Sequence, residues 1–234
     1  MNSIIEGLRA AFSLIINVDT ELLAIIFLSL KVSGSALVIA TAVGLPIGAL
    51  TGLKRFRGKR LVISVMNTFM GLPPVVAGLV LYLILSRSGP LGFMSLLYTP
   101  SAMIIAQSIL ATPIVASLSH SAIVGVDPIV RQASITLGAT PFQSSLTIIN
   151  EARYGIMAGI IAALGRAMAE VGAVLMVGGN IAGYTRVMTT TIALETDKGN
   201  FELALALGII LLFLSLLINI ILHSVQRKGA VKRN

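Results

Sequence analysis

The chain has 234 residues, of which 56% are hydrophobic and only 11% charged, and its mean hydropathy is +0.97. A water-soluble domain needs more charge on its surface, so this composition excludes one and indicates an integral membrane protein. The net charge of +8 comes from short clusters beside apolar runs, which argues against nucleic acid as a partner. The length allows about five spans of ~20 residues, so we expect a single transmembrane domain, 1–234.

The first twenty residues carry apolar side chains at near-helical spacing together with Glu6 and Arg9. This pattern predicts an N-terminal helix in the membrane interface or, alternatively, a packed terminus, and we expect no signal peptide. Residues 32–53 are free of charge and cover about 33 Å as a helix, enough for a first span. Lys31 opens that span, where its long stem is expected to carry the ammonium to the interface.

Further apolar runs predict four more spans, at about 61–86, 101–123, 154–177 and 203–223. Pro73 and Pro74 lie inside the second span and should kink or restart its helix, because proline has no N–H to donate. A broken helix at membrane depth must face protein or a watery cavity, which makes both prolines candidates for a pathway or gate. Residues 178–202 are expected to form an outer loop.

Basic residues predict the orientation of these spans. The densest basic cluster, 54–60, follows the first span, and four more basic residues lie in the tail after the last span. With this loop and the tail inside, eleven of the 17 Lys and Arg residues are cytoplasmic and four are outside. The positive-inside rule therefore predicts a multi-pass protein of the cytoplasmic (inner) membrane of a prokaryote, with its N-terminus outside and its C-terminus inside.

Arg166 and Glu170 are ionisable residues within the fourth predicted span. Their spacing of four places them on one helix face, where they can neutralise each other. A pair that fixes helix packing, a direct role in a polar pathway and a proton relay through Glu170 all remain open.

The outer loop offers polar groups at Gly179, Asn180 and the run from Thr189 through Thr190 to Thr191. Their amides and hydroxyls suit either an anion path or ordinary turn chemistry. The two histidines lack a metal-ligand partner at helical spacing, so no metal site is expected. A phosphate-binding loop is also absent, so we expect no catalytic residues and no cofactor bound by this chain.

Small residues recur at helical spacing on two spans. Gly44, Gly48 and Gly52 lie four apart on the first, and Gly155 and Gly159 on the fourth. Such spacing lets helices approach closely, and we interpret it as packing.

The segment 125–151 is the one polar, helix-capable stretch between long apolar runs. Asp127 and Pro128 form a good helix start, as a cap followed by proline at the first helical position. Gly138 is a suitable terminator, so we predict a short cytoplasmic helix at about 127–138. An apolar stripe on this helix would offer a surface to a partner. Its expected members are Ile129, Val130, Ala133 and Leu137.

This segment resembles the EAA loop of ABC importer membrane subunits, in which Glu-Ala-Ala precedes a glycine at fixed spacing. Gln132, Ala133 and Ser134 occupy the Glu-Ala-Ala positions and Gly138 the glycine, so Gln132 departs from the usual Glu. The sequences PPVVAG (73–78) and SGPLG (88–92) resemble the molybdate, tungstate and sulfate branch, and residues 165–208 look most like tungstate permeases. The resemblance covers about residues 22–225.

The resemblance implies an all-α membrane protein with the ABC importer type I permease fold, in which the helix at 127–138 couples to an ATPase. It implies a homodimer with a second copy, two cytoplasmic ATPase subunits that hold ATP and Mg, an outer oxyanion-binding protein and surrounding lipid. The residues expected to couple to the ATPase are Asp127, Ile129, Val130, Gln132, Ala133, Ser134, Leu137 and Gly138. The candidate pathway or gate residues are Pro73, Pro74, Arg166, Glu170, Asn180, Thr189 and Thr190.

Two other classes of membrane protein fit the sequence less well. An ion-coupled secondary transporter could use Glu170, but it usually has inverted repeats, and none is evident. A purely structural subunit would not need prolines at membrane depth or a capped helix outside the membrane. Within the importer family the expected cargo is tungstate, with molybdate or sulfate as alternatives.

Overall fold

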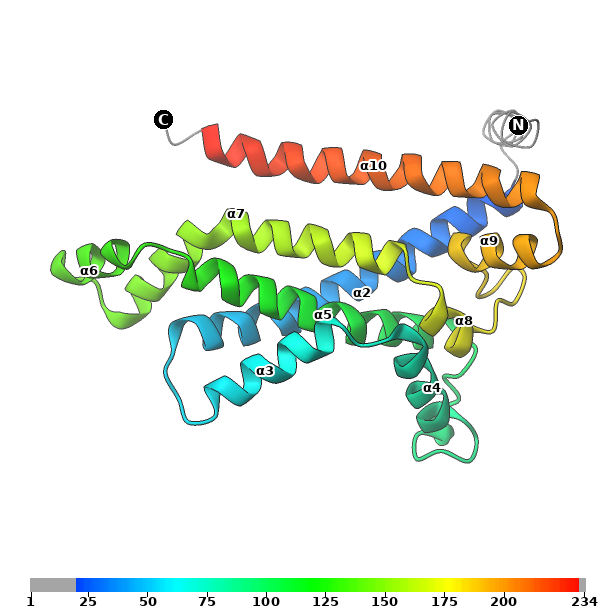
Figure 1. The fold of residues 1–234 in the computed structure, drawn as a ribbon, viewed down its shortest axis with the longest axis horizontal. Coiled ribbons are helices and arrows are strands. Elements are labelled where there is room, and N and C mark those ends of the chain that lie inside the picture. Colours follow the sequence, from blue (N-terminus) through cyan, green and yellow to red (C-terminus); the bar gives the residue numbers. More distant parts are fainter. Residues whose placement is uncertain (1–19, 232–234) are drawn as a thin grey trace. The chain divides into compact units, whose positions relative to one another are not determined.

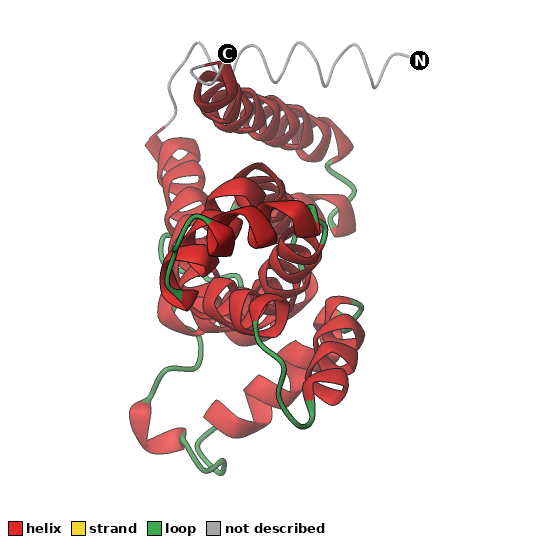
Figure 2. Ribbon diagram, turned by 90° about the vertical axis from the view of Figure 1, so that its left-hand side faces the viewer, coloured by secondary structure: helices red, strands yellow, loops and turns green. Residues whose placement is uncertain are grey.

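The computed structural model describes residues 20–231, which form helices connected by turns and loops, with no strand in that range (Figures 1 and 2). This confirms the predicted all-α class. The helices are α2 (Thr20–Leu53), α3 (Lys59–Met70), α4 (Pro74–Leu85), the short 3-10 helix η1 (Gly92–Met94), α5 (Pro100–Val124), α6 (Pro128–Thr136), α7 (Pro141–Met168), α8 (Gly172–Gly178), α9 (Met188–Asp197) and α10 (Phe201–Val231). The predicted N-terminal interfacial helix lies outside the described residues.

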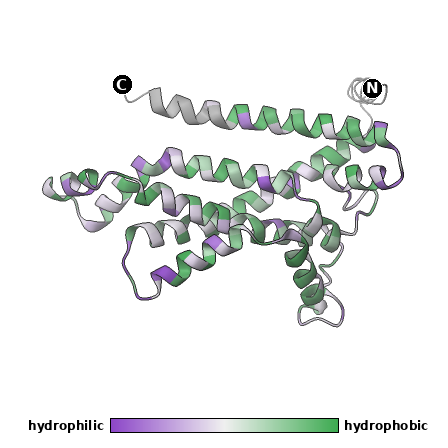
Figure 3. Ribbon diagram, viewed as in Figure 1, coloured by the Kyte–Doolittle hydropathy of each residue, from purple (hydrophilic) through white to green (hydrophobic). Residues whose placement is uncertain are grey.

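Three described helices, α2, α5 and α10, are long and apolar enough to cross a membrane. Two bent pairs also qualify when each is taken as one span: α3 with α4, and α7 with α8. The total is then five, the number expected from the sequence. Figure 3 shows the apolar character most clearly along α4 and the coloured part of α10.

The break between α3 and α4 lies at the predicted prolines. Pro73 is the cap of α4 and Pro74 its first residue, while α3 ends at Met70. Because proline cannot donate to the preceding turn and disfavours helical geometry in the residue before it, the pair ends one helix and starts the next. The prediction of a kink or restart here is confirmed.

A second break, at residues 169–171, was not expected. The predicted span over 154–177 is not one continuous helix, because α7 ends at Met168 and α8 starts at Gly172. Gly172 approaches α4 closely: a Cβ there would lie 2.9 Å from Val75 Cγ2. The break is therefore tied to the packing of α8 against α4, a contact between segments far apart in the sequence.

The first helix is longer than predicted, since it begins at Thr20 and not at residue 32. Lys31 consequently lies exposed within the helix and does not open it. The extension packs through Leu22 and Ile25 into a cluster with Met188 and residues of α10. Burial of these apolar side chains stabilises helical turns that the charge pattern had excluded from the span.

The predicted outer loop at 178–202 also proved wrong in part, because it contains helix α9. Met188 is fully buried at its start, and α9 packs along α10. Thr189 and Thr190 therefore lie in the first turn of a helix and not in a loop. Threonine is a weak helix former, so tertiary contacts and not propensity hold this helix.

The chain divides into two compact units. One comprises residues 1–36, 73–107 and 165–234, and the other residues 37–72 and 108–164. The boundaries fall inside α2, α5 and α7, so each of these helices contributes to both units. The single-domain layout stays a prediction.

Within the unit of residues 37–72 and 108–164, the glycines mark helix contacts. A Cβ at Gly48 would lie 2.5 Å from a backbone oxygen of α5, and Gly44 and Gly52 meet the same helix as closely. Gly155 and Gly159 of α7 approach α5 from another side, at 2.7 and 2.8 Å from its side chains. The packing interpretation of these glycines is confirmed, because any larger residue would push the helices apart.

Candidate functional site

Helix α6 starts as the sequence predicts. The Asp127 carboxylate accepts the Ile129 N–H at 2.8 Å, and Pro128 takes the first helical position. The first N–H groups of a helix have no acceptor within the helix. The Asp127 carboxylate accepts from one of them, and Pro128 has no N–H that would need an acceptor. The predicted cap is confirmed.

The helix ends at Thr136, and Gly138 lies just beyond the end as the predicted terminator. The Gly138 N–H donates to Ile135 O at 2.9 Å and the Ala139 N–H donates to Ser134 O at 3.0 Å. Gly138 has φ +83°, the left-handed conformation that this type of helix end requires and that glycine adopts without strain. Two local signals therefore fix both ends of α6.

A capping box, which the sequence reasoning missed, stabilises the start of α7, the helix that follows α6. The Thr140 N–H donates to Gln143 Oε1 at 2.8 Å, and the Gln143 N–H donates to Thr140 Oγ1 at 3.3 Å. The Ser134 and Ser144 hydroxyls are 2.7 Å apart and link the two helices directly. The spacing of threonine and glutamine, three apart before an apolar run, was the available signal.

No residue of α6 is buried. Ile129 is 66% exposed and Leu137, the residue after the last helical turn, is 88% exposed. Val130 differs from the other predicted members of the stripe because it is half-buried, like Ser134 on the same side of the helix. The exposed members of the predicted stripe are therefore Ile129, Ala133 and Leu137, and Ile135 adds a further exposed apolar side chain on this helix.

Glu170 lies at the break between α7 and α8, and its side chain is 2% exposed. One carboxylate oxygen is 3.5 Å from Arg166 Nη1, which confirms that the two residues pair. The other oxygen accepts the Ala173 N–H at 3.0 Å, and the Thr189 hydroxyl donates to the Glu170 backbone carbonyl at 2.9 Å. The predicted position on a continuous helix face is wrong, because the chain leaves the helix before Glu170.

This arrangement bears on the alternatives for Glu170. Both carboxylate oxygens already have partners, one of which is the first turn of α8. A carboxylate that holds a helix start and a guanidinium has a structural task, so the geometry favours packing over a proton relay. Arg166 is 41% exposed and has guanidinium donors beyond the atom that pairs with Glu170.

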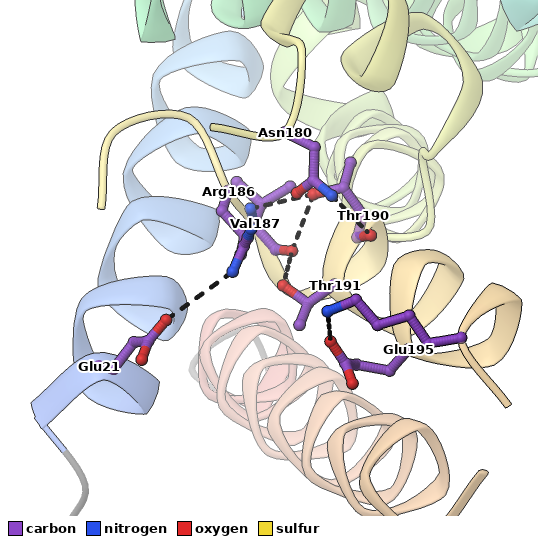
Figure 4. A network of polar contacts seen from close by, with 8 residues as sticks. Glu21, Asn180, Arg186, Val187, Thr190, Thr191 and Glu195 are labelled. Atoms are coloured by element: carbon purple, nitrogen blue, oxygen red, sulfur yellow. Dashed lines mark hydrogen bonds and ion pairs between the residues drawn. The ribbon is translucent and has the colours of Figure 1, made fainter. Parts of the chain in front are cut away.

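Asn180 and the threonines of α9 form a polar network (Figure 4). The Asn180 side-chain amide donates to Thr190 O at 3.3 Å, and its own oxygen is buried with no partner among the described residues. The Thr190 hydroxyl accepts the Val187 N–H at 3.1 Å. Asn180 has φ +50° and follows Gly179, so turn geometry accounts for part of this network.

Two charged groups in the same region were missed by the sequence reasoning. Arg186 lies 3.8 Å from Glu21, and its Nε is buried without a partner among the described residues (Figure 4). The Lys198 ammonium lies 2.8 Å from the buried Glu195 carboxylate and holds the pKa of that carboxyl below its usual value. Burial acts in the opposite direction and raises this pKa, while the hydrogen bond from the Asn200 amide lowers it further. Glu195 lies on the unexpected helix α9, and Lys198 directly follows that helix.

The structure thus brings the predicted residues together in two separate groups. Glu170 contacts Arg166 and Thr189, and Asn180 contacts Thr190, all within the unit that also contains Pro73 and Pro74. The residues of α6 belong to the other unit. Among the described residues no group of three or more His, Asp or Glu side chains could hold a metal ion.

The helical fold matches that of membrane subunits of solved ABC importers. An inward-facing MetNI methionine ABC transporter superposes with a TM-score of 0.74 at 19% identity, covering 88% of this chain and 95% of that chain. A bacterial ABC transporter that imports alginate gives a TM-score of 0.73 at 18% identity, covering 90% of this chain and 80% of that one. The chain therefore has the type I ABC importer permease fold, as predicted.

Sequence comparison defines the family. Residues 44–229 match the model for "Binding-protein-dependent transport system inner membrane component", and the chain belongs to this family. It is 44% identical to the tungstate uptake system permease protein TupB of Peptoclostridium acidaminophilum, over 97% of this chain and all of that protein. It is 49% identical to a probable anion ABC transporter permease of Haloferax volcanii, over 86% of this chain and 88% of that one. TupB of Campylobacter jejuni is 35% identical over 97% of this chain and 95% of its own length.

Proposed function

We propose that this chain is the membrane-spanning subunit of an ATP-driven importer of tungstate. The observation that carries the proposal is its similarity, over 97% of its length, to two permeases named for tungstate uptake, at 44% and 35% identity. Molybdenum permeases are 28% and 30% identical, and sulfate permeases 28%. Molybdate and sulfate are therefore the alternative cargoes.

The structure of α6 supports coupling to an ATPase subunit. Its ends are fixed by local hydrogen bonds, while Ile129, Ala133 and Leu137 present apolar surface to solvent. A rigid short helix with such a surface suits a groove on a partner, and a movement of that partner would pass to α7 through the Ser134–Ser144 contact. ATP and Mg would then be held by the ATPase, and this chain would carry out no bond chemistry.

For the remaining assembly we propose the subunits that the family resemblance implies. A second copy of the chain, two ATPase subunits inside and an oxyanion-binding protein outside would complete the importer, with lipid around the spans. The basic clusters support a cytoplasmic position for residues 54–60 and α6, with the N-terminus outside and the C-terminus inside.

For the pathway we propose a role for the two breaks. Pro73 and Pro74 end one helix segment, Glu170 fixes another, and a rotation at either point would change how α4 and α8 line a path. Arg166 is the candidate for meeting an anion, because its side chain is 41% exposed. Asn180 and Thr190 are candidate gate residues through the hydrogen bond between them, and Thr189 is a candidate through its bond to the Glu170 carbonyl.

Uptake into proteoliposomes tests the proposal. The chain is reconstituted with its genomic neighbours, the ATPase and the binding protein, and radiolabelled tungstate is supplied outside with ATP inside. We expect uptake that requires all three components and ATP, and that molybdate and sulfate inhibit only at higher concentration. Uptake by this chain alone under a proton or sodium gradient would refute the importer, and stronger competition by molybdate or sulfate would change the cargo.

A further inference from the structure

A basic cavity lies in the unit of residues 37–72 and 108–164, where α2 and α5 end. Its volume is about 290 Å³. The side chains that line it include four cations and one acid, so the lining carries a net positive charge. The five charged residues are Lys54, Arg55, Lys59, Arg131 and Asp127.

No described carboxylate neutralises the cations of this cavity. Among the described residues, no carboxylate lies within 4.0 Å of any of the four. Asp127 is already engaged, since its carboxylate caps α6 through the Ile129 N–H. Cations gathered around one space repel each other, so an anion placed between them would lower the electrostatic energy.

The walls of the cavity are fixed by packing. Ile123 and Ile148 line it and are 4% and 6% exposed, as part of a buried cluster with Ala152 and Ile156. A Cβ at Gly52 would lie 2.6 Å from Ile123 Cγ2, so the end of α2 rests directly on α5. The apolar wall of the cavity is therefore part of the packed core of this unit.

The start of α3 adds to the positive potential. Lys59, the first residue of this helix, lines the cavity, and no side chain caps the helix at Gly58. The first amides of a helix carry partial positive charge and stay available to an anion when no side chain accepts from them.

From this arrangement we propose that the cavity binds a tetrahedral oxyanion group. Two arginines and two lysines around one space supply the forked and point-charge donors that phosphate-type oxygens prefer. The group is supplied either by the phosphate of an anionic lipid, whose headgroup lies at the level where spans end, or by a free oxyanion. The site is separate from the proposed pathway residues and from the exposed stripe of α6.

Direct binding measurements on the full-length chain test this proposal. The purified protein in a neutral detergent is titrated with dihexanoyl phosphatidylglycerol, with dihexanoyl phosphatidylcholine as the uncharged control, and separately with inorganic phosphate. The test variant is Arg55→Gln with Arg131→Gln. The control is Arg57→Gln, which removes one positive charge from the loop that also carries Arg55, at a residue that does not line the cavity.

We expect saturable binding of an anionic probe that weakens at least about tenfold in the double variant and stays within about twofold of wild type in Arg57→Gln. The pair Arg55→Lys with Arg131→Lys should retain part of the binding, which separates charge from a folding defect. Binding of phosphatidylglycerol well above that of phosphate assigns the site to lipid, and equal binding of phosphate assigns it to a free anion.

Three results would overturn the proposal: no saturable binding of either probe, unchanged binding in the double variant, or an equal loss in Arg57→Gln. Absence of probe binding together with weaker ATPase association in the double variant would instead assign the cavity to a protein partner. The titration needs neither ATP nor the binding protein, so its outcome is independent of the proposed importer function.

Discussion

Helix α6 and the region from the α7–α8 break to α9 are held by opposite means. Every hydrogen bond that defines α6 joins residues a few positions apart, and none of its residues is buried. The break region depends on bonds between distant residues, such as Thr189 with Glu170 and Met188 with Ser29, and it buries a carboxylate. Changes on α6 should therefore affect association with partners, whereas changes at the break should affect folding.

Replacing Glu170 should give the largest effect. Glu170→Ala leaves Arg166 without its partner and the Ala173 N–H without an acceptor, and we expect a loss of about 2–3 kcal/mol in stability. Glu170→Gln keeps an acceptor for Ala173 and should lose less. Thermal unfolding in detergent measures both, and a Glu170→Ala protein as stable as wild type would show that the break does not depend on this side chain.

Truncation of the exposed stripe on α6 should weaken association with the ATPase and leave stability unchanged, in contrast to changes at the break. Ile129→Ser with Leu137→Ser removes apolar surface that nothing in the described chain covers, so stability should stay within about 0.5 kcal/mol. Association with the ATPase should weaken at least about tenfold, as measured by co-purification and titration. Phe93→Ser, at another exposed apolar residue, is the control and should leave association unchanged. Normal ATPase binding in the double variant would remove α6 as the contact.

The substitution Gly138→Val tests the role of the C-terminal end of α6. Valine at φ +83° is strained by about 1–2 kcal/mol, which should distort the helix end, reduce tungstate uptake and weaken ATPase binding. Gly199→Val is the matched control, because Gly199 has φ +78° and a Cβ at either glycine would meet no other atom within 4 Å. Equal transport defects in the two variants would point to strain alone, and unchanged uptake in Gly138→Val would contradict the coupling assignment.

The smallest effect should be the pH dependence that arises from Glu195. Its folded-state pKa lies below the ordinary 4.5, chiefly because of the Lys198 hydrogen bond. The stability that it contributes is therefore complete above pH 4.5 and is lost as the pH falls through the lowered pKa. Melting temperatures of wild type and Glu195→Gln, measured from about pH 7 down to about 3.5, should converge at the acid end. Parallel curves would show that the pair contributes no such stability.

Local signals explain what could be predicted of the candidate site. Asp127, Pro128 and Gly138 act on their immediate neighbours, so their roles could be derived without knowledge of the fold. The pairing of Arg166 with Glu170 was predicted from spacing alone, but its setting was not, because the break at 169–171 results from α8 packing on α4. The half-buried position of Val130 was likewise decided by neighbours outside its own helix.

The sequence by itself determined the membrane class, the apolar runs, the proline break and the capped helix α6, because hydrophobic length and capping chemistry are properties of contiguous residues. Only the tertiary structure decided that α2 begins at Thr20, that α9 forms within an expected loop, and that Lys54, Arg55, Lys59 and Arg131 surround one cavity. Each of these depends on contacts between segments far apart in the chain. These features depend on burial and on the placement of charges in the folded chain, which a local sequence pattern cannot predict.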